Sequence, residues 1–378
     1  MQSSSQKSYV LSFIFPLFIC LSYLNLFISA QACNHNDKNV LLEIQSHFGN
    51  NASVFSTWDP NTNCCQNWTS IACDTDGCVN SLIVINADGI NNDFPSSVGS
   101  LPYLQVLQFS ALPHVFGEIP SSLAKLNNLV HLDLSLNNLT GPIPSFLTLL
   151  KGLNFIEFSS NNLSGPIPSS LSQLTNLISV NFGANKLSGP IPPSLGRLKS
   201  LKGLMLYANR FSGSIPSSLG QLSRLNNLNL RANHLTGSIP HSLSKLTNLS
   251  LLVLDTNRLS GPIPSFLGRL RKITLIVLAN NRFSGSIPAS LRNLLALSLL
   301  DVSHNKLTGS IPEFPKSLTN IDVSFNRLCG PIPKRWFNFD SHFFIIINAF
   351  VVLLYHLARL NTFKLKDLMF VSIIVCIQ

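Results

Sequence analysis

The stretch LNNLVHLDLSLNNLTGPIP at residues 126–144 decides the fold, and it returns as LKGLNFIEFSSNNLSGPIP at residues 150–168. Both stretches contain the pattern L-x-x-L-x-L-x-x-N-x-L-x-G-x-I-P. The Asn returns at a constant step of 24 residues, and a shorter last unit of 21 residues follows. These residues are Asn137, Asn161, Asn185, Asn209, Asn233, Asn257, Asn281, Asn305 and Asn326. A fixed period of this length, with Gly and Pro in phase, predicts a repeat architecture.

Each residue type in the unit has a physical role. A short segment such as Leu132-Asp133-Leu134 alternates apolar and polar residues, as a half-buried strand does. The Asn lies where the chain turns inward, and we expect its amide to bond the backbone of neighbouring turns in a buried ladder. An unpaired buried amide would cost about 1–3 kcal/mol. The Gly allows a tight bend and the Pro ends backbone pairing, so the Asn, Gly and Pro columns are predicted to be structural.

One unit cannot bury its own apolar face, whereas stacked units bury a continuous core. The sequence therefore predicts an α/β repeat solenoid of the plant leucine-rich-repeat type. This is a right-handed superhelix with a parallel β-sheet on the concave face and irregular or 3₁₀ turns on the convex face. About 10–11 units fit within residues 79–333, and the first two carry Asp88 and Leu112 in place of the Asn.

The composition excludes several classes of protein. Charged residues make up only 11%, which argues against a charge-rich coiled coil and an acidic disordered tail. Lys and Arg total 26 against 16 Asp and Glu, a mild excess that falls short of a nucleic-acid footprint. Because no paired Cys or His spacing is present, we predict no metal site. We also predict no cofactor and, from the mild charge excess, no nucleic-acid partner.

Residues 1–32 are predicted to be an export signal. Lys7 precedes an almost wholly apolar run, and Ala30-Gln31-Ala32 fits a small-residue cleavage site. The alternative is an uncleaved anchor, because the apolar run approaches the length that spans a bilayer. Export makes disulfides and N-glycosylation reasonable. The sequons are at Asn51, Asn67, Asn138, Asn162 and Asn248.

Residues 33–78 are predicted to form a disulfide-stapled N-terminal cap. Asp37 is expected to cap a helix in which Val40, Leu41, Ile44 and Phe48 recur on one face, and Gly49 is expected to end it. Adjacent Cys64 and Cys65 are expected to pair with different partners, but the connectivity stays open. The disulfide candidates are Cys33, Cys64, Cys65, Cys73, Cys78 and Cys329.

The positions six, four and two residues before each ladder Asn are predicted to face outward from the concave sheet. Among them, five aliphatic residues should form one exposed apolar patch, which commonly marks a partner site. Acidic residues flank this patch, and Tyr and Arg are residue types that often dominate interfaces. The predicted partner-binding residues are Asp133, Glu157, Tyr207, Arg231, Leu251, Val253, Asp255, Leu275, Val277, Leu299 and Asp301.

Basic residues gather in the turns that link the units. They are Arg197, Lys199, Lys202, Arg269, Arg271 and Lys272. They could hold an acidic wall polysaccharide, since a basic surface attracts polyanions. The alternative is a solvated rim without a ligand.

No catalytic residues are predicted. His131, Asp133 and Ser135 alternate along one strand, but alternate strand residues are about 6.7 Å apart, whereas a triad needs hydrogen-bond reach. None of the common hydrolase, kinase or metalloprotease motifs occurs in the sequence. We therefore expect a binding protein and no enzyme.

Both ends of the repeat array resemble the plant polygalacturonase-inhibiting proteins. The resemblance covers about residues 33–333 and includes Thr57-Trp58-Asp59-Pro60, Cys64-Cys65, Leu101-Pro-Tyr-Leu104 and Val323-Ser-Phe-Asn-Arg-Leu-Cys-Gly330. It implies an extracellular cell-wall defence protein that binds and inhibits secreted polygalacturonases of pathogens through the concave face. Pectin is a further candidate partner, through the basic residues named above. The acidic residues match that family by position in the repeat. The alternative is a membrane-held receptor-like protein that recognises a peptide or wall fragment; a general role in growth or development is a third reading.

The tail, residues 334–378, departs from that family, whose C-terminal cap carries further Cys after the Leu-Cys-Gly motif. We expect Cys329 to lack such a cap here. The apolar segment 343–358 falls short of the ~20 residues that span a bilayer. Three readings stay open: a membrane anchor, a gene-model artefact that replaces the cap, and a folded or interfacial tail.

Overall fold

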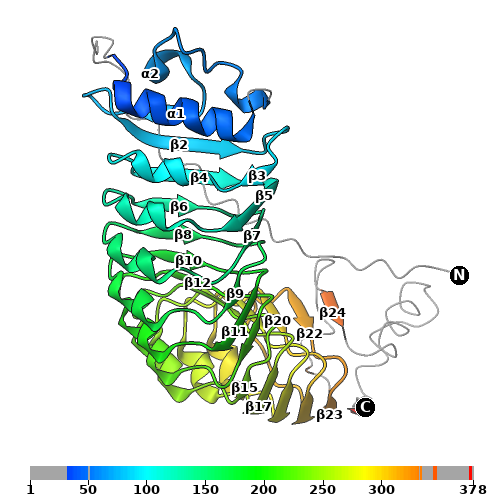
Figure 1. The fold of residues 1–378 in the computed structure, drawn as a ribbon. Coiled ribbons are helices and arrows are strands. Elements are labelled where there is room, and N and C mark those ends of the chain that lie inside the picture. Colours follow the sequence, from blue (N-terminus) through cyan, green and yellow to red (C-terminus); the bar gives the residue numbers. More distant parts are fainter. Residues whose placement is uncertain (1–31, 50–51, 332, 334–343, 347–373, 377–378) are drawn as a thin grey trace, which may run out of the picture.

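The computed structural model describes residues 32–49, 52–331, 333, 344–346 and 374–376. The predicted export signal up to residue 31 and the sequon at Asn51 lie outside the described residues. The described chain forms one curved stack of coils that begins at a helical cap (Figure 1). The predicted leucine-rich-repeat solenoid is confirmed.

A sheet of 13 strands lines the concave face of this stack. Its first pair is antiparallel and all later pairs are parallel and in register. Each repeat contributes one strand of about three residues, in which the central Leu, Ile or Val is buried and its neighbours face outward. In order, the strands are β1 (Ile71–Cys73), β2 (Val79–Ile85), β4 (Val106–Ser110), β6 (His131–Asp133), β8 (Phe155–Glu157), β10 (Ser179–Asn181), β12 (Gly203–Met205), β14 (Asn227–Asn229), β16 (Leu251–Val253), β18 (Leu275–Val277), β20 (Leu299–Asp301), β22 (Asn320–Asp322) and β24 (Phe344–Ile346).

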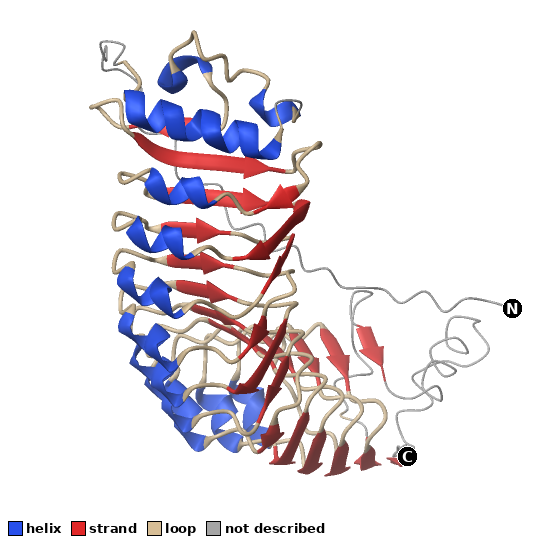
Figure 2. Ribbon diagram, in the orientation of Figure 1, coloured by secondary structure: helices blue, strands red, loops and turns tan. Residues whose placement is uncertain are grey.

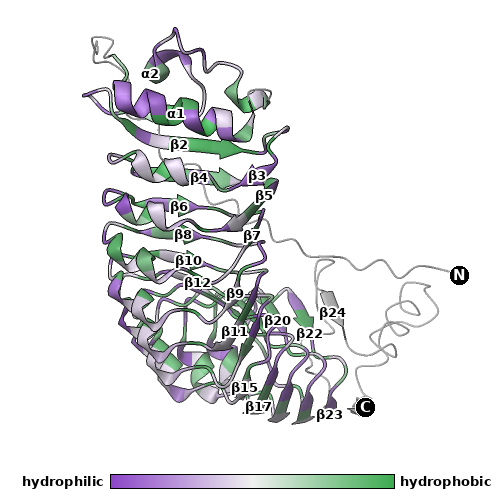
Figure 3. Cartoon of the chain, in the orientation of Figure 1, coloured by the Kyte–Doolittle hydropathy of each residue, from purple (hydrophilic) through white to green (hydrophobic). Residues whose placement is uncertain are grey.

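A second set of strands follows the ladder Asn in each unit and covers the lateral face, where its residues are mostly polar (Figure 3). The first three-stranded sheet is β3 (Asn92–Asp93), β5 (Leu112–Glu118) and β7 (Asn137–Thr140). The next is β9 (Ser164–Gly165), β11 (Lys186–Pro190) and β13 (Arg210–Ser212). The last is β15 (Thr236–Gly237), β17 (Arg258–Pro262), β19 (Arg282–Gly285), β21 (Lys306–Gly309), β23 (Arg327–Pro331) and β25 (Ile374–Cys376).

Short 3₁₀ helices form the convex face, as Figure 2 shows in blue. In the regular units a Pro precedes the helix, because its fixed φ suits the start of a helical turn. These helices are η2 (Ser96–Ser100), η3 (Ser121–Lys125), η4 (Ser145–Leu149), η5 (Ser169–Gln173), η6 (Pro193–Arg197), η7 (Ser217–Gln221), η8 (His241–Lys245), η9 (Ser265–Arg269) and η10 (Ala289–Asn293).

The Asn residues form the expected ladder. Asn233 is typical: its Oδ1 accepts from the Phe211 amide at 2.9 Å, and its Nδ2 donates to the Leu206 carbonyl at 2.9 Å. Both partners belong to the preceding unit. Nδ2 also contacts the carbonyls of Leu230 and Arg231 within its own unit. Each amide therefore joins two successive coils and satisfies backbone groups that the turn leaves unpaired.

Close contacts between glycine and serine set the spacing of several convex helices. An added Cβ on Gly220 would lie 2.3 Å from the Ser242 carbonyl oxygen of the next unit. Ser242 Oγ in turn donates to the Ser217 carbonyl at 2.6 Å. The same close approach occurs at Gly99, Gly196 and Gly268.

We expect Gly220→Val to lower the free energy of unfolding by about 2 kcal/mol, because a backbone carbonyl cannot yield to the new side chain without separating the coils. Urea titration would measure the change. Thr148→Val is the matched control at the equivalent position of η4, where the existing side chain already fits. Equal effects at both sites would show that Gly220 is not a spacing residue.

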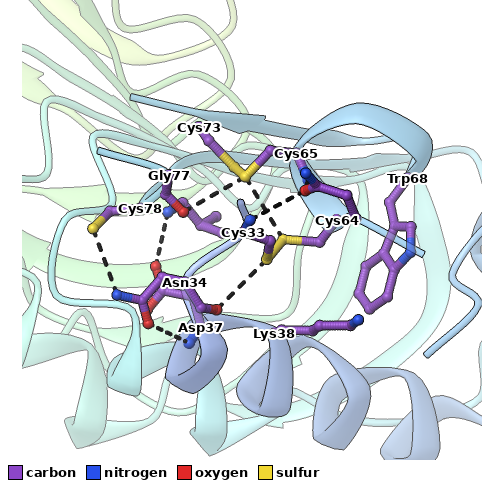
Figure 4. Close-up of a disulfide and its surroundings, with 12 residues drawn as sticks. Cys33, Asn34, Asp37, Lys38, Cys64, Cys65, Trp68, Cys73, Gly77 and Cys78 are labelled. Carbon is purple, nitrogen blue, oxygen red and sulfur yellow. Dashed lines mark hydrogen bonds between the residues drawn. A yellow bond between two sulfur atoms is a disulfide. The ribbon is translucent and has the colours of Figure 1, made fainter. Parts of the chain in front are cut away.

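The N-terminal cap consists of α1 (His35–Phe48), η1 (Ser53–Phe55) and α2 (Cys64–Asn67), and its disulfides are drawn in Figure 4. On the predicted apolar face, Leu41, Ile44 and Phe48 are buried and Val40 is half-buried, and Gly49 ends the helix. The predicted helix cap is wrong, because Asn34 accepts from the first-turn amides. Asp37 lies inside the helix and accepts from the Val79 amide at 2.8 Å.

Disulfides join Cys33 to Cys64 and Cys65 to Cys73, so the adjacent cysteines do reach different partners. The expectation for Cys78 is wrong: its thiol is free and buried, and its Sγ accepts from Asn34 Nδ2 at 3.8 Å. The sulfurs of Cys33, Cys64 and Cys65 lie within 4.8 Å of one another, but the two disulfides consume the thiolates that a metal would need.

The described parts of the tail continue both sheets. β24 pairs in parallel with β22, and β25 pairs antiparallel with β23. Cys329 is disulfide-bonded, and the register places it opposite Cys376. The expectation that Cys329 lacks a cap is therefore wrong, because tail strands satisfy the edges that the last repeat would expose. The rest of the predicted apolar segment 343–358 lies outside the described residues, and no helix within the described part of the chain is long and apolar enough to cross a bilayer.

Candidate functional site on the concave face

The concave surface is less open than the sequence pattern indicates. Most residues in the columns six and four positions before the ladder Asn are half-buried. The column two positions before the Asn is largely buried, including Asp255, Ala279 and Ser303. This column follows the strand at the point where the chain turns, and most of its side chains are small.

Leu251, Val253, Leu275, Val277 and Leu299 form a continuous surface, which we call the concave apolar patch. Leu251, Leu275 and Leu299 lie opposite one another on β16, β18 and β20, and Val253 lies opposite Val277. All five side chains are half-buried. The patch is therefore a shallow apolar area across three strands.

A polar pair borders the patch on the side of β14. Arg231 Nε lies 3.1 Å from Asp255 Oδ2, and the Thr256 hydroxyl donates to the same oxygen at 3.2 Å. The Arg231 side chain is 54% exposed, whereas Asp255 as a residue is only 6% exposed. Asp255 Oδ1 is buried without a hydrogen-bond partner. Burial raises the pKa of Asp255, and the Arg231 charge opposes that rise.

Asp301 borders the patch on the opposite side, directly opposite Val277. Its Oδ1 accepts from the Ser303 amide at 3.0 Å and from the Ser303 hydroxyl at 2.7 Å. Burial raises the pKa of Asp301, and these hydrogen bonds lower it. Asp322 lies next to it on β22. The patch therefore has a cation on one flank and carboxylates on the other.

A second polar cluster lies nearer the N-terminal cap, around Glu157. Burial raises the pKa of Glu157 to about 7, Ser159 and Asn181 lower it by hydrogen bonding, and the Asp133 charge raises it. Burial, followed by the charge of Glu157, raises the pKa of Tyr207, and hydrogen bonding to Asn181 and Ser159 lowers it. These contacts bring Glu157 and Tyr207 together across the sheet.

Gly183 makes this arrangement possible. An added Cβ on Gly183 would lie 2.2 Å from Cε1 of Tyr207, so the ring occupies the space that a side chain would fill. The ring thus reaches back across β10 toward Glu157. The sequence shows these residues, but only the stacked coils show that the Tyr207 ring lies over Gly183.

Asp133, a predicted partner-binding residue, is less accessible than the sequence pattern indicates. It is buried, its Oδ2 accepts from Gln108 at 2.8 Å, and its Oδ1 accepts from Ser135 Oγ at 2.6 Å. The expectation that alternate residues of this strand are too far apart for a hydrogen bond was wrong for Asp133 and Ser135. Ser135 lies past the end of β6, where the chain turns, and its hydroxyl reaches Asp133. His131 packs against the Phe155 ring, and burial lowers its pKa.

The basic rim separates into two parts. Lys202 and Lys272 line an open basin of about 490 Å³ together with Arg224 and Asn248. Lys199 instead donates to the Gly196 carbonyl at 2.8 Å and to Gln221 Oε1 at 3.0 Å, so it supports the convex turn. Lys272 Nζ donates to Asn248 Oδ1 at 2.7 Å.

Sequence reasoning missed a basic column on the lateral face. In most units the residue after the ladder Asn is basic and exposed, and its strand partner in the preceding unit is Ser or Thr. The sequence could have revealed this column, because its residues recur with the repeat period directly after the ladder Asn. The column comprises Lys186, Arg210, Arg258, Arg282, Lys306 and Arg327.

The four described sequon residues are accessible. Asn67 and Asn138 are exposed, and Asn162 and Asn248 are half-buried. Asn162 and Asn138 follow ladder residues of consecutive units and are hydrogen-bonded to each other. A glycan on either one would occupy the start of the column that becomes basic at Lys186.

Two family models match the chain. The leucine-rich-repeat N-terminal domain matches residues 34–74. The leucine-rich repeat itself matches residues 128–150, 152–174, 200–222, 224–246, 272–294 and 296–318. A solved structure, described as a plant ice-binding protein, is 33% identical with a TM-score of 0.68, and the match covers 77% of this chain and 95% of that one. The chain belongs to the plant leucine-rich-repeat proteins. These matches support the leucine-rich-repeat assignment made from the sequence, both in the N-terminal cap and in the repeats.

This leucine-rich-repeat protein has polygalacturonase inhibitors among its curated relatives. Polygalacturonase inhibitor 1 of Arabidopsis thaliana is 40% identical over 124 residues, which is 31% of this chain and 37% of that protein. The chain spans about a third of the length of the curated relatives it matches. The ectodomain of the Arabidopsis receptor kinase HAESA, solved with a peptide hormone, is 36% identical with a TM-score of 0.73; the match covers 82% of this chain and 53% of that one.

Proposed function

We propose that the protein is a secreted cell-wall protein that binds and inhibits polygalacturonases through its concave face. The observation that carries this proposal is the concave apolar patch with charged flanks, on a chain whose curated relatives include polygalacturonase inhibitors. Contiguous apolar surface within a polar rim is typical of protein interfaces. Glu157 and Tyr207 extend the proposed contact toward the N-terminal cap, and disulfides fit an oxidising, extracellular setting. In this proposal the protein catalyses no reaction, and it inhibits the polygalacturonase by binding to it.

The direct test measures reducing-end release from polygalacturonate by a panel of fungal polygalacturonases, with and without the full chain. Inhibition of at least one enzyme with a measurable Kd supports the proposal. Full activity of every enzyme, together with peptide binding at the same face, would favour the receptor-like alternative. That alternative rests on the likeness to receptor ectodomains, one of them solved with a peptide hormone.

We expect Leu275→Lys together with Val277→Lys to weaken polygalacturonase binding more than tenfold, because two ammonium groups would have to be desolvated in the contact. Both side chains are half-buried, so the lysines can extend their charges into water and the fold should survive. The matched control is Leu149→Lys with Leu295→Lys, at two exposed convex leucines. An unchanged Kd in the concave variant would contradict docking on the patch.

We further propose that pectin contacts the basic residues outside the concave face. The lateral column of Lys and Arg and the basin around Lys202 and Lys272 could each attract a polyanion. Such a contact would hold the inhibitor near the substrate of its target. Salt-dependent retention on immobilised polygalacturonate would test it.

A further inference from the structure

We propose that the concave apolar patch receives an extended polypeptide segment whose inward-facing side chains are acidic, apolar and basic, in that spatial order from Arg231 to Asp301. This inference rests on the proposed function, because it names the chemistry of the partner surface at the same face. It commits to a polypeptide occupant with an acid-x-apolar-x-base sequence, read in either chain direction.

The acidic end follows from the state of Arg231. Asp255 holds Nε, and the guanidinium is exposed at the edge of the patch. Because a guanidinium is a planar fork of five donors, fixing Nε leaves the Nη groups oriented for a carboxylate. Asp255 Oδ1 is buried without a hydrogen-bond partner, so the carboxylate has few alternatives to its bond with Arg231. Asp255 is thus a positioning residue that reduces the entropy lost when Arg231 binds.

The basic end follows from the opposite flank. Asp301 and Asp322 lie opposite each other on β20 and β22. No Lys or Arg in the outward columns of β16, β18, β20 or β22 faces them. Among the effects on the pKa of Asp301, burial, which raises it, is the largest, and the interaction with His304, which lowers it, is the last. An incoming ammonium or guanidinium would relieve the cost of two neighbouring half-buried carboxylates.

The spacing selects an extended segment. The Arg231 guanidinium lies over β16, where Asp255 holds it, and Asp301 belongs to β20, two strands further on. Strands about 4.8 Å apart, with a two-residue offset along the strand, separate the two charges by about 12 Å. Residues i and i+4 of an extended chain are about 13 Å apart, and residues i, i+2 and i+4 share one face. The midpoint between the two charges then lies in the coil of β18 between Val277 and Ala279, so the central residue contacts the patch at Val277.

The test uses the full chain and two synthetic peptides of identical composition. The first is acetyl-Ser-Asp-Ser-Leu-Ser-Lys-Ser-amide, and the second is acetyl-Ser-Leu-Ser-Asp-Ser-Lys-Ser-amide, which moves the apolar residue outside the charges. Titration followed by NMR should give a Kd about tenfold lower for the first peptide. Equal affinities, or no detectable binding of the first peptide, would overturn the proposal.

Two charge-neutralising variants locate the charges. Arg231→Gln and Asp301→Asn should each weaken binding of the first peptide about fivefold and leave the second unchanged. Asp301→Asn retains the acceptor for Ser303, so it remains informative if Arg231→Gln destabilises the fold. Arg292→Gln, at an exposed cation of η10 outside the patch, is the control and should change neither Kd. Wild-type affinity in both patch variants would also overturn the proposal. Failure of the proposed function would appear separately, as an absence of polygalacturonase inhibition.

Discussion

Replacing Asn233 by Leu is expected to lower the free energy of unfolding by about 4 kcal/mol. The side chain is 6% exposed, accepts from the Phe211 amide and donates to carbonyls of two successive coils. Leucine has similar volume but no polar atoms, so it would leave these backbone groups buried and unpaired. Each unpaired group costs about 1–3 kcal/mol, and several are lost together.

Urea titration followed by circular dichroism would measure this loss. Asn127→Leu is the control, because Asn127 is exposed in a linking turn, and it should change stability by less than about 0.5 kcal/mol. The expected signature is also local. A solenoid is held together by contacts between neighbouring coils, so amide exchange should rise first in the units that contain Phe211 and Asn233. A loss below 1 kcal/mol would mean that the ladder is replaceable by packing alone.

Stability is expected to fall by about 2–3 kcal/mol as the pH rises from about 4.5 to about 7, because the pKa of Glu157 is raised from 4.5 to about 7 in the folded protein. In this range the folded state retains the Glu157 proton and the unfolded chain has released it. The folded state is therefore favoured at the acid end, and this contribution is lost as the pH passes through the raised pKa. Partial exposure to solvent reduces the effect from its upper limit.

Unfolding of wild-type and Glu157→Gln protein at pH 5 and pH 8 would test this dependence. The Gln variant mimics the protonated acid, so its stability should vary less between the two pH values. Glu43→Gln, at an exposed position of α1, should retain the wild-type dependence. The charge of Asp133 also disfavours the ionised form of Glu157. An identical pH profile in Glu157→Gln would assign the dependence to other groups.

Repetition made much of the fold predictable. One unit with inward Leu, a turning Asn and a Gly bend reappears with the same spacing, so a rule derived from Asn137 holds at Asn233 and Asn305. The concave apolar patch was predictable for the same reason, since Leu251, Leu275 and Leu299 are in phase. The export signal, the cap boundaries and the glycan sites remain predictions.

The errors arose where a side chain departs from the regular coil. Asp37 was expected at the helix start, yet it turns inward because the Val79 amide needs an acceptor. Asp133 was expected to face a partner, yet Gln108 and Ser135 occupy its oxygens. Cys78 was expected to form a disulfide, yet its neighbours pair with one another. Each outcome depends on a contact between segments that the local pattern does not describe.

The sequence by itself determined the period, the solenoid and the direction in which each strand residue points, because these follow from local spacing repeated in every coil. Only the tertiary structure decided how much of each outward side chain water can reach and which charges meet. Curvature and side-chain length act across several coils at once: Arg231 reaches Asp255 on the next strand, and Tyr207 reaches toward Glu157 over Gly183. The binding surface is therefore a property of the stacked coils, whereas the sequence of one coil already specifies the path that every coil repeats.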